Sequence, residues 1–130
     1  MKNVTIAAIL AVTGTAAFAG DPVEGVWKTK PDDNGHFGYV DVKPCGPAFC
    51  GTLIKAFDDA GKEIDSPNVG KQIIWDMVAY GDGVYDDGKV WSPDRDKTYN
   101  SDMTLSGDTL AVRGCVFGLC RDGGTWSRVK

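Results

Sequence analysis

The amino-acid sequence predicts an all-β domain, built as a small up-and-down antiparallel barrel of about eight strands. Three observations carry this prediction. Apolar residues alternate with polar ones at period two over much of the chain, turn-forming residues break the alternation at short intervals, and no stretch of useful length has helical periodicity. Sequential hairpins favour a meander, and closing it into a barrel leaves no exposed edge. A β-sandwich is the alternative.

The alternation locates the individual strands. In chain order, strands are expected at residues 25–30, 37–43, 50–57, 72–80, 84–86, 89–91, 98–106, 109–116 and 125–129. Four of these segments place apolar side chains on one face, as a strand with one buried side does. Their apolar faces consist of Gly38, Val40 and Val42; Ile73, Trp75, Met77 and Ala79; Tyr99, Met103 and Leu105; and Leu110, Val112 and Val116.

Turn-forming residues separate these strands. Asp87-Gly88 lies between two short strands, as the two-residue type I′ turn of a hairpin requires, and Gly107-Asp108 has the order expected for type II′. Residues 59–61, 93–94 and 122–124 are further breaks, because they combine aspartate with glycine or proline.

Residues 1–19 predict a secretory signal peptide. Met1-Lys2-Asn3 is a basic start, an uncharged apolar stretch follows, and Ala17-Phe18-Ala19 has the small-x-small pattern that signal peptidases cut after. The apolar stretch is shorter than the roughly 20 residues that a membrane span needs, which disfavours an anchored helix. We therefore expect a single domain at residues 20–130, without a membrane span, in a periplasmic or secreted location.

The four cysteines all lie after the expected cleavage site, as Cys45 with Cys50 and Cys115 with Cys120, both in C-x4-C spacing. An even number of cysteines in a small exported protein predicts disulfides. We favour pairing within each motif, because each motif flanks a hairpin turn, where cross-strand neighbours lie close enough to bridge. A four-cysteine zinc site is the alternative, although such sites usually use a two-residue spacing.

Composition and motifs disfavour several classes of function. The formal net charge is −4 and no basic stripe is present, so nucleic acid and anionic lipid are poor candidates for binding by charge. The single histidine, His36, has a loop-like context, and none of the familiar catalytic or phosphate-binding motifs occurs. We therefore expect neither a cofactor nor an enzymatic activity.

Aspartates occur in pairs, at residues 32–33, 58–59 and 86–87, with two more at 94 and 96. Calcium prefers several carboxylate oxygens, so these pairs raise the question of a calcium site. None of them has EF-hand spacing, and aspartate is a good turn former. Turn formation is the favoured interpretation, and no metal is expected.

Tryptophan and arginine occur near both ends of the expected barrel. Trp27 lies in the first strand, whereas Trp126 and Arg128 lie in the last. The first and last strands of a closed barrel are neighbours, so Trp27 and Arg128 are expected to stack across the barrel floor. Such a cation–π contact contributes about 0.5–2 kcal/mol.

Four segments resemble the bacterial exported family called domain of unknown function 2147. They are GVWKT at residues 25–29, CGPAFCGTLI at 45–54, VWSPDRDKTYNSDMTLSGDTLAVRGC at 90–115 and CRDGGTWSRV at 120–129. The resemblance implies a lipocalin-like barrel, and a barrel-closing pair made by Trp27 with Arg128 or Arg113. Residues 66–71 depart from the pattern of other members. The family carries no assigned activity, so the resemblance implies a fold rather than a function.

Two functions fit a lipocalin-like barrel. The first is binding of a small apolar ligand, since eight strands can enclose one small molecule or be filled by their own side chains. Candidates for the ligand-lining residues are Val40, Val42, Ile73, Trp75, Met77, Tyr99, Met103 and Leu105.

The second function is a protein-interaction module with a filled barrel, such as an inhibitor or an envelope assembly factor. The two cysteine-clipped loops carry apolar residues that could anchor a protein partner or equally fold back onto the barrel. These residues are Pro47 and Phe49 in the first loop, and Phe117 and Leu119 in the second.

Overall fold

The computed structural model describes residues 20–130, and their regular structure consists of β-strands alone. The expected signal peptide at residues 1–19 lies outside the described residues. None of the described residues forms a helix long and apolar enough to cross a membrane. The strands are β1 (Gly25–Lys28), β2 (Phe37–Cys45), β3 (Ala48–Phe57), β4 (Glu63–Ile64), β5 (Gln72–Gly81), β6 (Val84–Ser92), β7 (Lys97–Ser106), β8 (Thr109–Val116) and β9 (Leu119–Arg128).

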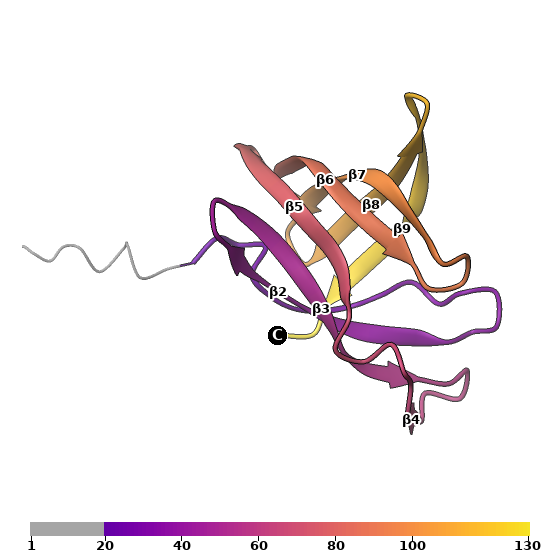
Figure 1. The fold of residues 1–130 in the computed structure, drawn as a ribbon. Helices are drawn as coiled ribbons and strands as arrows, with labels where there is room; N and C mark the ends of the chain where they lie inside the picture. Colours follow the sequence, from indigo (N-terminus) through magenta and orange to yellow (C-terminus); the bar gives the residue numbers. More distant parts are fainter. Residues whose placement is uncertain (1–19) are drawn as a thin grey trace, which may run out of the picture.

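The sheet closes on itself as an antiparallel barrel (Figure 1). The strand order is β2-β1-β9-β8-β7-β6-β5-β3, and pairing of β2 with β3 joins the two ends. The short β4 pairs only with the end of β3 and stands outside the ring. The predicted eight-stranded barrel is therefore confirmed, and closure makes β1 and β9 neighbours, with Trp27 paired to Arg128.

One predicted turn is wrong. Asp87-Gly88 does not reverse the chain, because β6 runs without interruption from Val84 to Ser92. The register against β7 shifts between Tyr85 and Gly88, and Asp87 has a φ of 65°, so this pair forms a β-bulge. The reversal lies at Asp82-Gly83, where both φ angles are positive, as in a type I′ turn.

Of two further predicted breaks, one is a turn and the other is not. Gly107-Asp108 does join β7 to β8, and Gly107 alone of the two has a positive φ, of 59°, as type II′ requires. Residues 122–124 do not break the chain, because they lie inside β9, where the register against β8 shifts. Aspartate and glycine tolerate the left-handed backbone of bulges as well as of turns, so sequence alone does not separate the two.

The barrel has two unlike ends. The residues preceding β1, the chain's C-terminus and the two-residue turns at 82–83 and 107–108 lie at one end (Figure 1). This end is called the floor below. Its tightly packed side chains, each at most 1% exposed, are Val23, Trp27, Val42, Met77, Met103 and Leu110. The longer loops, at residues 29–36, 58–71 and 93–96, lie at the opposite end with the β8–β9 turn.

Candidate functional site

A cavity of about 970 Å³ occupies the end of the barrel opposite the floor. This end is called the mouth. Small-molecule sites commonly measure about 300–1,000 Å³, so the space suits one small ligand. The strands contribute apolar and aromatic side chains to the wall, because inward-facing residues alternate with outward-facing ones along each strand. These residues include Val40, Leu53, Ile73, Val90, Tyr99, Val112 and Trp126.

The eight residues predicted to line a ligand site do not all lie in one place. Three of them, Val40, Ile73 and Tyr99, do line the cavity. Four others pack in or against the core instead: Val42, Met77, Met103 and Leu105. The periodicity identified the inward face of these strands, but it carries no information on which half of the barrel is filled.

Trp75 was assigned to the wrong face. It is absent from both the cavity wall and the core, whereas its neighbour Ile74 is fully buried. The register of β5 against β3 shifts between Gln72 and Ile74, so Ile73 and Ile74 are both buried and Trp75 turns outward. Asp76, with a φ of 58°, breaks the alternation again, and Met77 points inward. The run Ile73-Ile74-Trp75 gives no signal of this change.

Charged residues surround the mouth. The cavity lining includes four aspartates and four side chains with basic nitrogen groups. The aspartates are Asp32, Asp33, Asp94 and Asp122, and the others are Lys30, Arg95, Arg121 and His36. Burial raises the pKa of the Asp94 carboxyl, and the nearby carboxylates of Asp32 and Asp33 raise this pKa further. The mouth thus combines an apolar interior with a rim of both charges, which suits a molecule with an apolar body and a polar end.

Aspartates at the rim shape their own loops. The Asp32 carboxylate accepts hydrogen bonds from the backbone N–H groups of Asn34 (2.8 Å) and His36 (3.0 Å). Asp58 accepts bonds of the same kind from Ala60 and Lys62. These side-chain to backbone bonds are the turn chemistry predicted for the paired aspartates.

Trp27 and Arg128 meet at the floor. The guanidinium carbon of Arg128 lies 4.4 Å from the centre of the Trp27 ring. Arg128 also donates hydrogen bonds to the carbonyl oxygens of Pro22 (2.6 Å) and Glu24 (3.1 Å). The Trp27 indole N–H donates to the Val23 carbonyl at 2.9 Å. The segment before β1 is thereby fixed across the floor and closes this end of the barrel.

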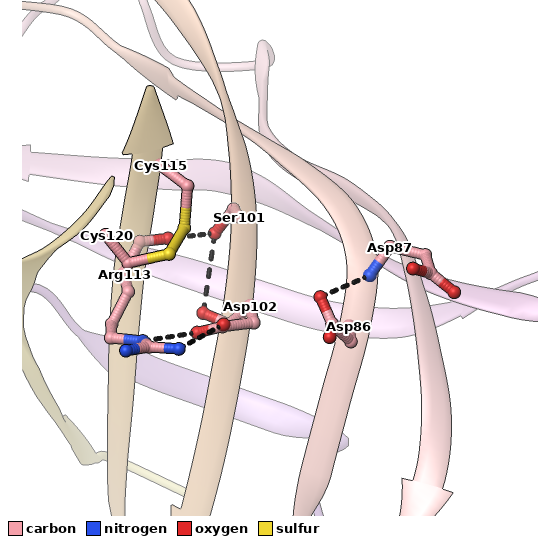
Figure 2. A network of polar contacts seen from close by, with 7 residues as sticks. All are labelled: Asp86, Asp87, Ser101, Asp102, Arg113, Cys115 and Cys120. Carbon is pink, nitrogen blue, oxygen red and sulfur yellow. Dashed lines mark hydrogen bonds and ion pairs between the residues drawn. A yellow bond between two sulfur atoms is a disulfide. The ribbon is translucent and has the colours of Figure 1, made fainter. Parts of the chain in front are cut away.

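The other arginine that the family resemblance offered, Arg113, lies elsewhere. Figure 2 shows its guanidinium pairing with the Asp102 carboxylate, with Nε–Oδ1 and Nη2–Oδ2 distances of 2.8 and 2.5 Å. Beside this pair, the Ser101 hydroxyl donates to the Arg113 carbonyl at 2.6 Å. Arg128, not Arg113, therefore stacks on Trp27.

Two disulfides join Cys45 to Cys50 and Cys115 to Cys120. The first clips the β2–β3 turn near the floor, and the second clips the β8–β9 hairpin (Figure 2). No cysteine among the described residues is free, so the four-cysteine zinc site is excluded in this structure. Among residues 20–130, the Asp102 carboxylate lies near the sulfurs of Cys115 and Cys120, as in a metal site. These two sulfurs are bonded to each other, however, so they are not thiolate ligands.

The two clipped loops present their apolar residues differently. Phe49 folds back onto the barrel, where its ring meets the Tyr85 ring edge-on at 5.9 Å. Of the two outcomes that the sequence left open for Phe49, an exposed anchor or a packed residue, the structure shows the second. Phe117, by contrast, is fully exposed, and Leu119 is 72% exposed.

Comparison with known proteins agrees with this architecture. The sequence profile of a family described as an uncharacterized protein conserved in bacteria, domain of unknown function 2147 (DUF2147), matches residues 25–128. The chain is similar in structure to protein HP1028 of the human pathogen Helicobacter pylori, which is described as belonging to the lipocalin family. The TM-score is 0.67, the identity is 16%, and the match covers 85% of each chain. No curated protein matches the sequence significantly. At this identity the structural similarity shows a lipocalin-like fold.

Proposed function

Since the chain belongs to the bacterial DUF2147 family, whose name assigns no activity, we propose a function from its cavity: it binds one small, mainly apolar molecule. The observation that carries the proposal is the unequal filling of the barrel. Trp27, Met77 and Met103 fill the floor, whereas the mouth keeps a cavity of about 970 Å³. A barrel whose only role were structural would gain stability by filling that space as well.

The lining indicates the chemical class of the ligand. Aliphatic and aromatic side chains form the wall, so the buried part of the ligand is apolar, and the hydrophobic effect supplies most of its binding free energy. Charged groups stand at the rim, where they can face a polar end of the ligand. Because the wall presents these apolar groups, the proposal is one of binding rather than catalysis.

The bacterial envelope is the proposed location. Two disulfides in a chain of this size fit an oxidising compartment, and the signal peptide predicted at residues 1–19 would deliver the protein there. A protein-interaction role, the alternative, would depend on the β8–β9 turn alone, because Phe49 is packed against the barrel.

Gly114 offers a direct test of the cavity. It lies in the cavity lining, and a Cβ added there would meet the Tyr99 side chain at 3.5 Å, an ordinary contact distance. Leucine at this position would therefore extend into the cavity without backbone strain. Ala111, on the same strand, faces the opposite side from its buried neighbours Leu110 and Val112, so Ala111→Leu is the matched control.

The measurement is the fluorescence of an apolar naphthylamine probe titrated with each purified protein. We expect the wild type and Ala111→Leu to enhance the fluorescence alike, and Gly114→Leu to bind the probe at least about tenfold more weakly, because the leucine takes the probe's space. Equal binding by Gly114→Leu, or no binding by the wild type, would refute the proposal. Comparison of native and denatured masses of protein isolated from its own envelope would then identify the natural ligand.

A further inference from the structure

We propose that the tip of the β8–β9 hairpin, residues 116–119, is a docking element that inserts its apolar side chains into the surface of an anionic phospholipid membrane. Docking by the tip does not require a loaded cavity. Docking would also bring the mouth to a source of apolar ligands, and this consequence rests on the proposed function.

The tip presents a contiguous apolar surface to solvent. Val116, Phe117 and Leu119 are 46%, 100% and 72% exposed, respectively. Single exposed apolar residues are ordinary on a protein surface, but three on one four-residue turn form a patch. The hairpin projects beyond the barrel at its mouth, and the same three residues belong to the cavity lining (Figure 1). The apolar patch thus continues into the cavity.

The backbone at the tip holds an exposed aromatic residue in a strained conformation. Phe117 has a φ of 52° and Gly118 a φ of 80°, as in a type I′ turn. Asparagine, aspartate or glycine normally occupies the first of these positions, because a bulky side chain is disfavoured at positive φ. Strained residues concentrate at functional sites. The Cys115–Cys120 disulfide closes the base of the turn and holds its shape, which lowers the entropy lost on insertion.

A basic side chain stands close behind the apolar tip. Residues 113–121 contain two arginines and no acidic residue, although Asp122 follows directly. Asp102 pairs with Arg113, whereas Arg121 is exposed and lies opposite Gly114, close behind the tip. A basic side chain behind an inserted apolar tip faces the anionic headgroups, where it contributes to binding.

A membrane fits the tip better than a folded partner does. A narrow projecting turn enters a fluid lipid surface without needing a complementary groove, and apolar side chains beside a basic residue are the composition of interfacial segments. If the tip docks on a protein instead, it should show no affinity for vesicles, and that result of the test would contradict the proposal.

The test is flotation of the ligand-free protein with vesicles of phosphatidylcholine alone, or of phosphatidylcholine with phosphatidylglycerol at about 7:3. We expect the wild type to float with the anionic vesicles. Phe117→Asn should weaken this binding about tenfold or more, because it removes the most exposed apolar side chain. Arg121→Gln should weaken it about fivefold on anionic vesicles and leave any binding to neutral vesicles unchanged.

Controls separate docking from folding and from ligand binding. Asparagine tolerates a positive φ, so Phe117→Asn should melt at the same or a higher temperature than the wild type. Val84→Ser removes an exposed apolar side chain far from the tip, and it should bind vesicles as the wild type does. If the wild type does not float, or if folded Phe117→Asn floats equally well, the proposal is wrong. A failure of the cavity would leave the vesicle result intact.

Discussion

The Arg128 guanidinium lies over the indole ring of Trp27, 4.4 Å from the ring centre, although the two residues are at opposite ends of the domain sequence. Arg128 also donates a hydrogen bond from Nε to the Asp108 carboxylate at 3.0 Å. One side chain therefore links β1, β9, the β7–β8 turn and the segment before β1. This arrangement closes the floor and leaves the mouth as the place for a ligand.

We expect Arg128→Lys to lower the free energy of unfolding by about 2–4 kcal/mol. Lysine keeps the charge but loses the planar fork, hence the stacking and most of the three hydrogen bonds. Urea denaturation measures the change. Arg113→Lys is the matched control, and it should cost less than about 1 kcal/mol because the Arg113 side chain is 51% exposed and its ion pair is screened by solvent. Equal losses in the two variants would show that the floor contact has no special role.

The face change at Ile73-Ile74 predicts unequal effects of two neighbouring substitutions. Ile74→Ala should destabilise the protein by about 2–5 kcal/mol, because it leaves a hole beside fully buried side chains. Trp75→Ala should cost less, although it removes a larger side chain, since Trp75 lies outside the core cluster. The two variants are compared by their urea midpoints. A larger loss for Trp75→Ala would place that side chain, against the structure, inside the barrel.

The raised pKa of Asp94 predicts that the free energy of unfolding depends on pH. Its pKa is raised by burial and by Asp32 and Asp33, so the folded state holds the proton more tightly than the unfolded state does. Stability from this group is therefore fully present below the unfolded pKa and is lost as the pH rises through the folded one. Asp94→Asn should raise the melting temperature relative to the wild type at pH 7, and the difference should shrink towards pH 3.

Thermal melts of the two proteins across this pH range measure the effect of Asp94. Asp82→Asn, at an exposed position in the turn at the floor, controls for the loss of one negative charge, since asparagine tolerates the positive φ there. An Asp94→Asn advantage that did not depend on pH would contradict the assigned cause.

Each disulfide should contribute about 2 kcal/mol, because both close loops of only a few residues. Replacing Cys45 and Cys50 together by serine should cost more than replacing Cys115 and Cys120. Cys50 is 6% exposed, so a serine hydroxyl there is buried, whereas the second bridge clips an exposed turn. Urea denaturation compares the two double variants.

The disulfides themselves have a chemical check. Alkylation of the denatured wild type should add no label without reductant and should label all four cysteines after reduction. Labelling without reductant would contradict both bridges.

Local pattern was sufficient for most of the architecture. The bounds of β8 at Thr109–Val116 agree with the predicted segment, because an uninterrupted alternation between clear turns has one solution. The errors cluster where the strand register shifts, at Ile73-Ile74 in β5 and at Asp87 in β6. There the alternation fails without any break in composition, so the face of Trp75 and the role of Asp87-Gly88 could not be predicted.

The candidate site was predicted in part. Val40, Ile73 and Tyr99 were assigned to the lining and do line the cavity, but the charged rim was not foreseen. Asp32 and Asp94 come from loops far apart in sequence, and only the closed barrel brings their carboxylates close enough to interact. His36 was interpreted as a surface residue, and it too belongs to this rim.

The sequence by itself determined the all-β class and a ring of about eight strands, and it favoured the local pairing of the cysteines and the meeting of Trp27 with Arg128. These depend on short-range periodicity and on the fact that a closed meander makes its first and last strands neighbours. Only the tertiary structure decided which half of the barrel is filled, where the faces change and which apolar turn remains exposed. Those properties depend on how side chains from distant strands share one enclosed volume, and alternation along a single strand carries no record of that volume.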